Sequence, residues 1–301
     1  HYSPIEEYML ELPDWDGIDH IRRLADTLPC NNPEWRNQFY RWFLSVVAHW
    51  NGLDRMHANS VSPLLIGRQG CGKSTWCRNL LPPELLEYYT DSIDFSNKRD
   101  AELLLNRFAL INIDEFDSVS PSHQAFLKHI LQKPVINARQ PYKRSIQPLK
   151  RYASFVATSN NADLLNDPTG SRRFICIELT GNINHAIGLN HKQLYAQAAA
   201  ALRNNERYWF TSEEETAIIR NNHQFQQMPV EEQLFFQYFR LPETGEQGEL
   251  LPAAEILRRI EQRSKIKSGI RNMALFGRLL LKNNVIKKHT KTGNYYHVIE
   301  I

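Results

Sequence analysis

A glycine-rich loop between a short apolar strand and a helix constrains the fold of this chain more than any other feature. The strand is expected at 64–66, and the loop at 67–74 reads GRQGCGKS, which matches the pattern G-x-x-x-x-G-K-[ST]. A helix is expected to begin at Lys73 and to end before Pro82. Glycines in such a loop let successive backbone N–H groups surround phosphate oxygens where a helix begins. The loop therefore predicts phosphate binding on an α/β scaffold.

The residues of this loop have separate expected roles. The Lys73 ammonium would reach the β- and γ-phosphates of ATP, and the Ser74 hydroxyl would be a ligand of Mg²⁺. The other expected contacts with the nucleotide come from Gly67, Gly70, Cys71, Gly72 and Thr75. An ordinary glycine turn is the alternative, but the match lies between a strand and a helix, as phosphate binding requires.

Two acids follow a second apolar strand, which is expected at 108–113. Asp114 is placed to hold the Mg²⁺ shell and to help bind the nucleotide, and Glu115 is placed to polarise the attacking water. Acids often follow strands, so the pair alone is a weak signal. In a chain that already carries a phosphate-binding loop, the pair indicates a nucleotide-hydrolysing site.

Polar residues also flank the next two expected strands, at 152–158 and 174–179. Asn160 follows the first of them and would orient the attacking water, although a turn-forming asparagine is an alternative. Arg172 and Arg173 precede the second strand, and one of them would reach the γ-phosphate bound to a neighbouring subunit. A surface salt bridge is the alternative for this pair, and the sequence does not choose between the two arginines.

Short apolar strands separated by helical stretches predict an α/β fold in which helices cover both faces of a parallel sheet. Residues 1–60 are expected to form a helical lead-in. The core that contains the glycine-rich phosphate-binding loop, or P-loop, is expected at 61–185. A helical region would follow at 186–245. Residues 246–301 show two helices followed by a two-stranded ribbon, which is typical of a winged-helix domain.

Positive charge is concentrated at the end of the chain. Residues 251–301 contain eleven Lys and Arg against three Glu, a net charge of +8, whereas residues 1–250 sum to −5. This asymmetry favours an anionic partner such as DNA, with Lys287 and Lys288 among the expected contacts. A solvated basic surface is the alternative.

A second basic cluster surrounds Tyr142 in segment 135–151, which is expected to form a hairpin. Cations interleaved with an aromatic ring suit a loop that follows a nucleic-acid backbone. A solvated hairpin is again the alternative. The cations of this cluster are Arg139, Lys143, Arg144, Lys150 and Arg151.

Composition excludes several classes of protein. With 42% hydrophobic and 23% charged residues, the chain is globular. The longest apolar stretch, 42–50, is shorter than a membrane helix, and the first residues do not resemble a signal peptide. The four cysteines form no C-x-x-C pair and no histidine cluster suggests zinc, so we expect a reduced, cytoplasmic chain that does not contact a membrane.

In this order, the motifs resemble those of superfamily 3 helicase ATPases and, more narrowly, those of the virulence-associated protein E family of phages and genomic islands. Five stretches within residues 1–185 carry the resemblance: WDG at 15–17, GRQGCGKST at 67–75, IDE at 113–115, RQPY at 139–142 and DPTGSRRF at 167–174. The resemblance implies an AAA-like ATPase that assembles into a ring, expected to be a hexamer, with the hairpin directed into a DNA channel. It also implies the active-site residues Lys73, Ser74, Asp114, Glu115 and Asn160, completed by Arg172 or Arg173 from the adjacent subunit.

Two functions are therefore consistent with the sequence. The first is a nucleic-acid-dependent ATPase, a DNA helicase or translocase in the replication of a mobile element. The second is a regulatory or defence ATPase that remodels protein partners, or signals through them, without unwinding DNA. A small-molecule kinase is disfavoured, because a kinase needs an acceptor pocket and lid arginines and has no use for a basic tail.

Overall fold

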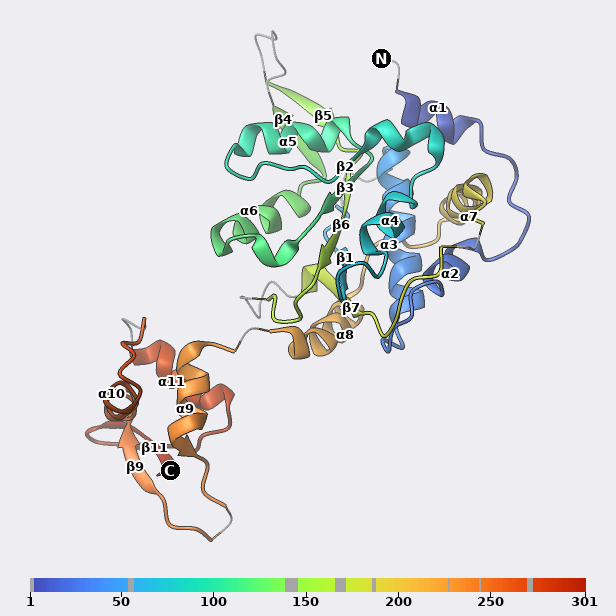
Figure 1. Cartoon of the computed structure of the whole chain (residues 1–301). Helices are drawn as coiled ribbons and strands as arrows, with labels where there is room; N and C mark the ends of the chain where they lie inside the picture. The colour runs from blue at the N-terminus through green and yellow to red at the C-terminus, as the bar shows by residue number, and fades with distance from the viewer. Residues whose placement is uncertain are drawn as a thin grey trace. The chain divides into compact units, whose positions relative to one another are not determined.

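The computed structural model describes residues 3–53, 57–138, 146–165, 172–185, 188–226, 228–243, 245–269 and 273–301. The chain forms two compact units, His1–Gln226 and Gln227–Ile301 (Figure 1). In the described parts of the chain, no helix combines the length and the apolar character needed to cross a membrane.

A five-stranded parallel sheet forms the centre of the first unit. Leu65 contacts one hydrophobic core, whereas Leu64 and Ile66 contact a second, because successive residues of a strand point to opposite faces. The predicted α/β class with a parallel sheet is confirmed. The strands lie in the order β2 (Tyr89–Thr90), β3 (Leu110–Ile113), β6 (Ser154–Ser159), β1 (Ser62–Ile66) and β7 (Phe174–Glu178).

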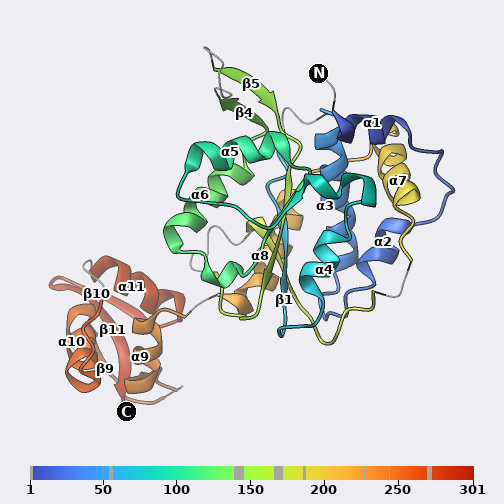
Figure 2. The same cartoon turned by 45° about the horizontal axis from the view of Figure 1, so that its top comes forward.

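Helices lie on both faces of this sheet (Figures 1 and 2). One face is covered by α5 (Lys98–Arg107) and α6 (Pro121–Leu131). The other face is covered by α1 (Pro4–Leu10), α2 (His20–Ala25), α3 (Trp35–Trp50), α4 (Lys73–Arg78) and α7 (His191–Arg203). Further helical elements among the described residues of the unit include η1 (Pro83–Tyr88), η2 (Phe116–Ser118), α8 (Ser212–Asn222), which packs beside β7, and η4 (His223–Phe225).

The predicted hairpin is present, because β4 (Val135–Ala138) and β5 (Gln147–Lys150) pair in antiparallel fashion. The expected DNA contacts Arg139, Lys143 and Arg144 lie outside the described residues. At the base of the hairpin, the expectation that Lys150 and Arg151 belong to a nucleic-acid-binding cluster is wrong.

Arg151 and Lys150 stabilise the fold instead of facing a nucleic acid. The Lys150 ammonium is hydrogen-bonded to the Glu6 carboxylate and also donates to the Trp50 carbonyl at 2.7 Å. The Arg151 side chain is only 1% exposed, and burying a guanidinium requires hydrogen-bond acceptors around it. The acceptors are the backbone carbonyls of Asn59, Ile130, Leu131, Lys133 and Ala153.

The second unit has its own hydrophobic core, which contains Phe235, Ile256, Phe276 and Val298. Its central strand β11 pairs antiparallel with β10 and with both β8 and β9. The unit begins before the expected boundary at 246, because its first helix and strand pack with the elements that follow. Its elements are α9 (Val230–Tyr238), β8 (Phe239–Arg240), β9 (Glu249–Pro252), α10 (Ala253–Ser264), α11 (Met273–Lys282), β10 (Lys287–Thr290) and β11 (Gly293–Glu300).

Candidate functional site

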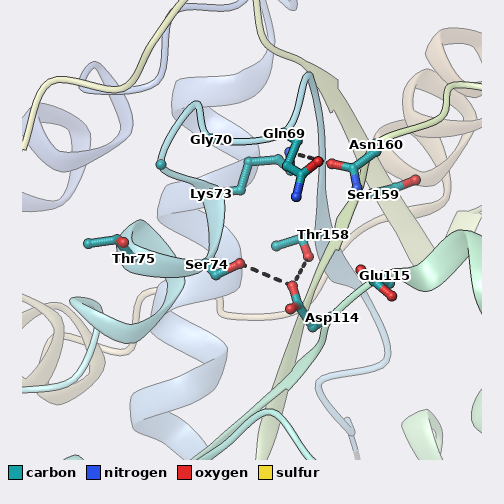
Figure 3. A pocket seen from close by; sticks show the side chains of 11 residues that line it. Gln69, Gly70, Lys73, Ser74, Thr75, Asp114, Glu115, Thr158, Ser159 and Asn160 are labelled. Carbon is teal, nitrogen blue, oxygen red and sulfur yellow. Dashed lines mark hydrogen bonds between the residues drawn. The ribbon is translucent and has the colours of Figure 1, made fainter.

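A pocket of about 320 Å³ lies where the carboxyl ends of β1, β3 and β6 meet (Figure 3). Parallel strands present their carboxyl ends at one edge of the sheet, and this edge is where ligands of such sheets bind. Three segments line the pocket: 69–75 after β1 except Cys71, Asp114 and Glu115 after β3, and 158–160 at the end of β6. The structure thus brings together the predicted loop, the two acids and Asn160.

The conformation of the loop depends on its glycines. Gly70 and Gly72 have φ angles of 79° and 98°, in the left-handed region that favours glycine. A Cβ atom at Gly72 would lie 2.2 Å from Nε2 of His185, so a side chain there would also displace the His185 ring. The segment after β7 reinforces this packing, since the Ile183 amide donates to the Cys71 carbonyl at 3.0 Å.

Lys73 provides positive charge inside the pocket. Its side chain is 7% exposed, and its Nζ donates to the carbonyls of Gly67 at 2.6 Å and Arg68 at 2.9 Å. The same Nζ donates to Oδ1 of Asn160 at 3.1 Å, and Figure 3 shows the two side chains facing each other. A largely buried ammonium beside exposed loop amides suits an anionic ligand with several oxygens.

Asp114 accepts two hydroxyl hydrogen bonds on one carboxylate oxygen. Ser74 Oγ donates to its Oδ1 at 3.0 Å, and Thr158 Oγ1 donates to the same atom (Figure 3). Hydroxyl and carboxylate oxygens are the ligands that Mg²⁺ prefers, and Mg²⁺ commonly takes one or two carboxylates plus phosphate oxygens and water. Within the described ranges no group of three or more His, Cys, Asp or Glu gathers. Ser74 and Asp114 therefore fit a cation that arrives with phosphate.

Glu115 lines the same pocket in an unusual backbone conformation. Its φ angle is 51°, which is uncommon for a residue other than glycine. Such conformations cluster at functional sites, where the surrounding structure maintains them. The Glu115 carbonyl accepts from both the amide and the hydroxyl of Ser118 at 2.8 Å, which closes the turn after β3.

Two expected loop contacts do not line the pocket. The Gly67 carbonyl instead accepts from Lys73, and the buried Cys71 thiol lies 3.8 Å from the Lys73 Nζ. Cys77, on the following helix, is fully buried, and burial raises the pKa of its thiol well above the usual range. All four cysteines are free, and Cys77 is not poised for thiolate chemistry.

Sequence reasoning missed four residues near or in the pocket. Gln69, Thr158 and Ser159 line it, and Asp117 binds the end of β6 from outside. Nearby polar positions in the sequence could have indicated Thr158 and Ser159, which directly precede Asn160, and Asp117, which lies two residues after Glu115. Their roles depend on the pairing of β3 with β6, which the sequence does not specify.

Arg172 and Arg173 lie at the opposite edge of the sheet from the pocket. They precede β7, and β7 runs parallel to β1, with Phe174 opposite Ser62 and Glu178 opposite Ile66. Arg172 Nη1 contacts Oε2 of Glu215 on α8 at 2.9 Å, and its side chain is 43% exposed. Within one chain, Arg172 therefore makes the salt bridge that the alternative interpretation predicts.

Four cations of the basic tail, Arg258, Arg259, Arg263 and Lys282, are paired with acids of their own unit. Over residues 227–301, twelve Lys and Arg face eight Glu, so the unit carries +4 rather than the +8 of its last 51 residues. Arg259 contacts Glu249, Glu255 and Glu300, and Lys282 lies 3.5 Å from Glu232. Lys287 and Lys288 are exposed on β10. The basic surface is therefore smaller than the composition of the tail indicates.

Solved structures with a similar fold include two of the C-terminal region of NrS-1. The A form apo structure of this region aligns over 100% of the present chain and 79% of that chain, with 14% identity and a TM-score of 0.50. The other apo structure aligns over 98% and 78%, with 14% identity and a TM-score of 0.47. At this level of identity the similarity concerns the fold alone.

Family comparisons divide the chain where the structure does. A domain of unknown function from B. Theta (DUF3874) matches residues 228–298, which is the second unit. A search of curated proteins finds no significant match. The virulence-associated protein E-like domain matches residues 9–227, which is nearly all of the first unit and well over half of the chain. The chain therefore belongs to the virulence-associated protein E-like family.

Proposed function

We propose that the protein is a nucleic-acid-dependent ATPase of the P-loop, AAA-like type, which acts as a superfamily 3-like helicase or translocase in the replication of a phage or other mobile element. The observation that carries the proposal is the convergence of Lys73, Ser74, Asp114, Glu115 and Asn160 in one pocket. Membership of the virulence-associated protein E-like family is consistent with it.

Strand order supports these roles. β6 lies between β1, which leads into the glycine loop, and β3, which leads into the two acids. Asn160, at the end of β6, is therefore placed between the phosphate-binding loop and Glu115. In this position its amide can orient a water molecule against the terminal phosphate.

Each residue then has a chemical task. The loop amides and Lys73 bind the phosphates, and the oxygens of Ser74 and Asp114 hold Mg²⁺. The metal neutralises charge on the phosphates when it is bound. Glu115 accepts the proton of the attacking water, and Asn160 positions that water.

The placement of Arg172 argues against a contact with the pocket of its own chain. From Ser62 to Ile66, β1 separates the two edges of the sheet by about 13 Å at ~3.3 Å per residue. An arginine at the start of β7 does not reach phosphates held at the other edge of its own sheet. Arg172 or Arg173 would instead serve the pocket of an adjacent copy, in a homo-oligomer that the resemblance implies is a hexamer.

The second unit is proposed to be a winged-helix domain that contacts DNA. Helices α9, α10 and α11 are followed by the ribbon β10–β11, which is the chain order expected of this fold. The exposed Lys287 and Lys288 on β10 are its proposed phosphate contacts. Arg139, Lys143 and Arg144 of the hairpin are the proposed contacts of the first unit.

Exposed apolar side chains on the second unit favour the alternative, a regulatory ATPase that acts on a protein partner. Leu275 and Leu281 on α11 are 53% and 42% exposed, and Ile286 before β10 is 66% exposed. Apolar side chains that form a contiguous surface patch often mark protein contacts. DNA-reading helices carry polar side chains toward the bases. Helix α11 carries the charged residues Arg278 and Lys282, but it also exposes Leu275 and Leu281.

The proposed function is tested by measuring the ATPase rate with and without single-stranded DNA, beside light scattering with and without nucleotide. Stimulation by DNA together with nucleotide-dependent assembly is expected. Stimulation by a protein partner alone would favour the regulatory ATPase. Absence of Mg²⁺-dependent ATP hydrolysis under all these conditions would contradict both functions.

The two lysines of β10 give a prediction about salt. Replacing Lys287 and Lys288 by alanine should flatten the plot of log affinity for duplex DNA against log salt concentration by about two units of slope, since each phosphate contact contributes ~0.9. The control is the charge-matched variant Arg258→Ala/Arg263→Ala, whose arginines contact Glu255 and Glu300. Equal slopes for the wild type and the lysine variant would leave the hairpin as the proposed DNA contact.

A further inference from the structure

Asp117 joins the turn after β3 to the end of β6. It lies in η2, two residues after Glu115, and both of its carboxylate oxygens accept hydrogen bonds from residues that flank Asn160. Ser159 Oγ lies 2.9 Å from Oδ1 and also 2.9 Å from the Asn161 carbonyl, so these two acceptors share its single proton. Asn161 Nδ2 donates to Oδ2 at 2.7 Å. The two donors come from a segment more than 40 positions away in the sequence.

The end of β6 is held at four successive residues. Thr158 donates to Asp114, Ser159 and Asn161 both donate to Asp117, and Asn160 accepts from Lys73. Ser159 is fully buried, and its hydroxyl also accepts from the Asn161 amide at 3.1 Å. Within this turn, Asn160 is the residue whose side chain contacts Lys73. The residues on either side of it, Ser159 and Asn161, both contact the Asp117 carboxylate.

We propose that Asp117 is a positioning residue of the active site, one that holds the Asn160 amide beside Lys73 and couples it to the turn that presents Glu115. This role rests on the proposed ATPase function. Asp117 does not line the pocket, and both of its oxygens are engaged by Ser159 and Asn161. It therefore acts through Asn160 and not on the nucleotide.

The expected effect follows from the sensitivity of catalysis to geometry. A displacement of a catalytic group by about 1 Å can lower a rate about 100-fold. Without the Asp117 carboxylate, Ser159 and Asn161 lose a shared acceptor. The Asn160 side chain is then held only by its contact with Lys73 and by the hydrogen bonds between Ser159 and Asn161. The phosphate-binding residues Lys73 and Ser74 keep their own contacts.

The test is a double-mutant cycle on the full chain with Asp117→Ala, Asn160→Ala and the double variant, assayed for kcat and for ATP affinity with Mg²⁺. We expect each single change to lower kcat about 10- to 100-fold, with ATP affinity within about threefold of the wild type. The double variant should be no slower than the worse single variant, because both changes remove the same function. Asp117→Asn, which keeps one acceptor oxygen, should recover part of the rate.

Asp91→Ala is the matched control, since Asp91 is an exposed acid of the same unit after β2. It should leave kcat unchanged. Bound nucleotide per chain normalises each rate for the folded fraction, so that loss of folding is not read as loss of catalysis. Multiplicative losses in the double variant, or a loss of ATP affinity in Asp117→Ala, would overturn the positioning role. A wild type without ATPase activity would overturn the proposed function itself.

Discussion

Lys73→Ala is expected to abolish ATP binding at micromolar nucleotide and to lower kcat/KM at least about 100-fold. The Lys73 ammonium is the cation that the described residues place inside the pocket, and a charge-assisted hydrogen bond to phosphate contributes about 1.5–3 kcal/mol or more when it is desolvated. The measurements are equilibrium binding of a fluorescent ATP analogue and steady-state hydrolysis, both with Mg²⁺.

Glu115→Gln is the matched control for this result, because it alters the same pocket without touching the phosphate-binding loop. It should bind ATP like the wild type and hydrolyse it about 100- to 10,000-fold more slowly, the usual contribution of a general base. Unchanged hydrolysis in Lys73→Ala would remove the assignment of the loop. Loss of ATP binding in Glu115→Gln would make Glu115 a structural or metal-binding residue.

The core of this site could be predicted from the sequence because phosphate chemistry restricts residue type. A loop proposed to wrap phosphate needs glycine at positions such as Gly70 and Gly72, because their positive φ angles disfavour other residues. The acids and Asn160 were identified because each ends an apolar strand. Parallel strands then bring these ends to one edge without any further information.

The residues that sequence reasoning missed depend on tertiary contacts. Local pattern treats Arg151 as a basic surface residue, yet backbone carbonyls from several segments satisfy its guanidinium in the core. Asp117 meets Ser159 and Asn161 only because β3 pairs with β6. The net charge of the tail likewise overstates its free charge, because acids before residue 251 pair with it.

Some missed elements were readable in principle. Helix α6 begins with Ser120 and Pro121, and the Ser120 hydroxyl accepts from the His123 amide. A serine cap followed by proline is a frequent start of a helix. The start of the second unit at α9 was harder to predict, since Val230–Tyr238 resembles the helices before it, and only packing with α10 and α11 assigns it to the later unit.

The second large effect is expected for Arg172→Ala, which should lower kcat about 1,000-fold while ATP still binds. The Arg172–Glu215 ion pair is partly exposed on both sides, and such pairs contribute only about 0–1 kcal/mol. Breaking this ion pair so that Arg172 can contact a phosphate bound to an adjacent copy therefore costs little free energy. If Arg172 is the residue that crosses the interface, Arg173→Ala, assayed in parallel, should have nearly the kcat of the wild type. If Arg173 crosses the interface instead, Arg173→Ala should be the slow variant and Arg172→Ala the nearly unchanged one.

Mixing the inactive arginine variant with Lys73→Ala tests whether the arginine acts between subunits. In a mixed ring, an interface that combines an intact pocket from the arginine variant with an intact arginine from the Lys73→Ala chain is complete. Activity should therefore reappear and pass through a maximum at intermediate ratios, although each variant alone is inactive. Mixing either variant with itself at the same total concentration is the control. If no ratio restores hydrolysis while light scattering shows that mixed rings form, the arginine does not act on a neighbouring pocket, and its salt bridge with Glu215 is a structural contact.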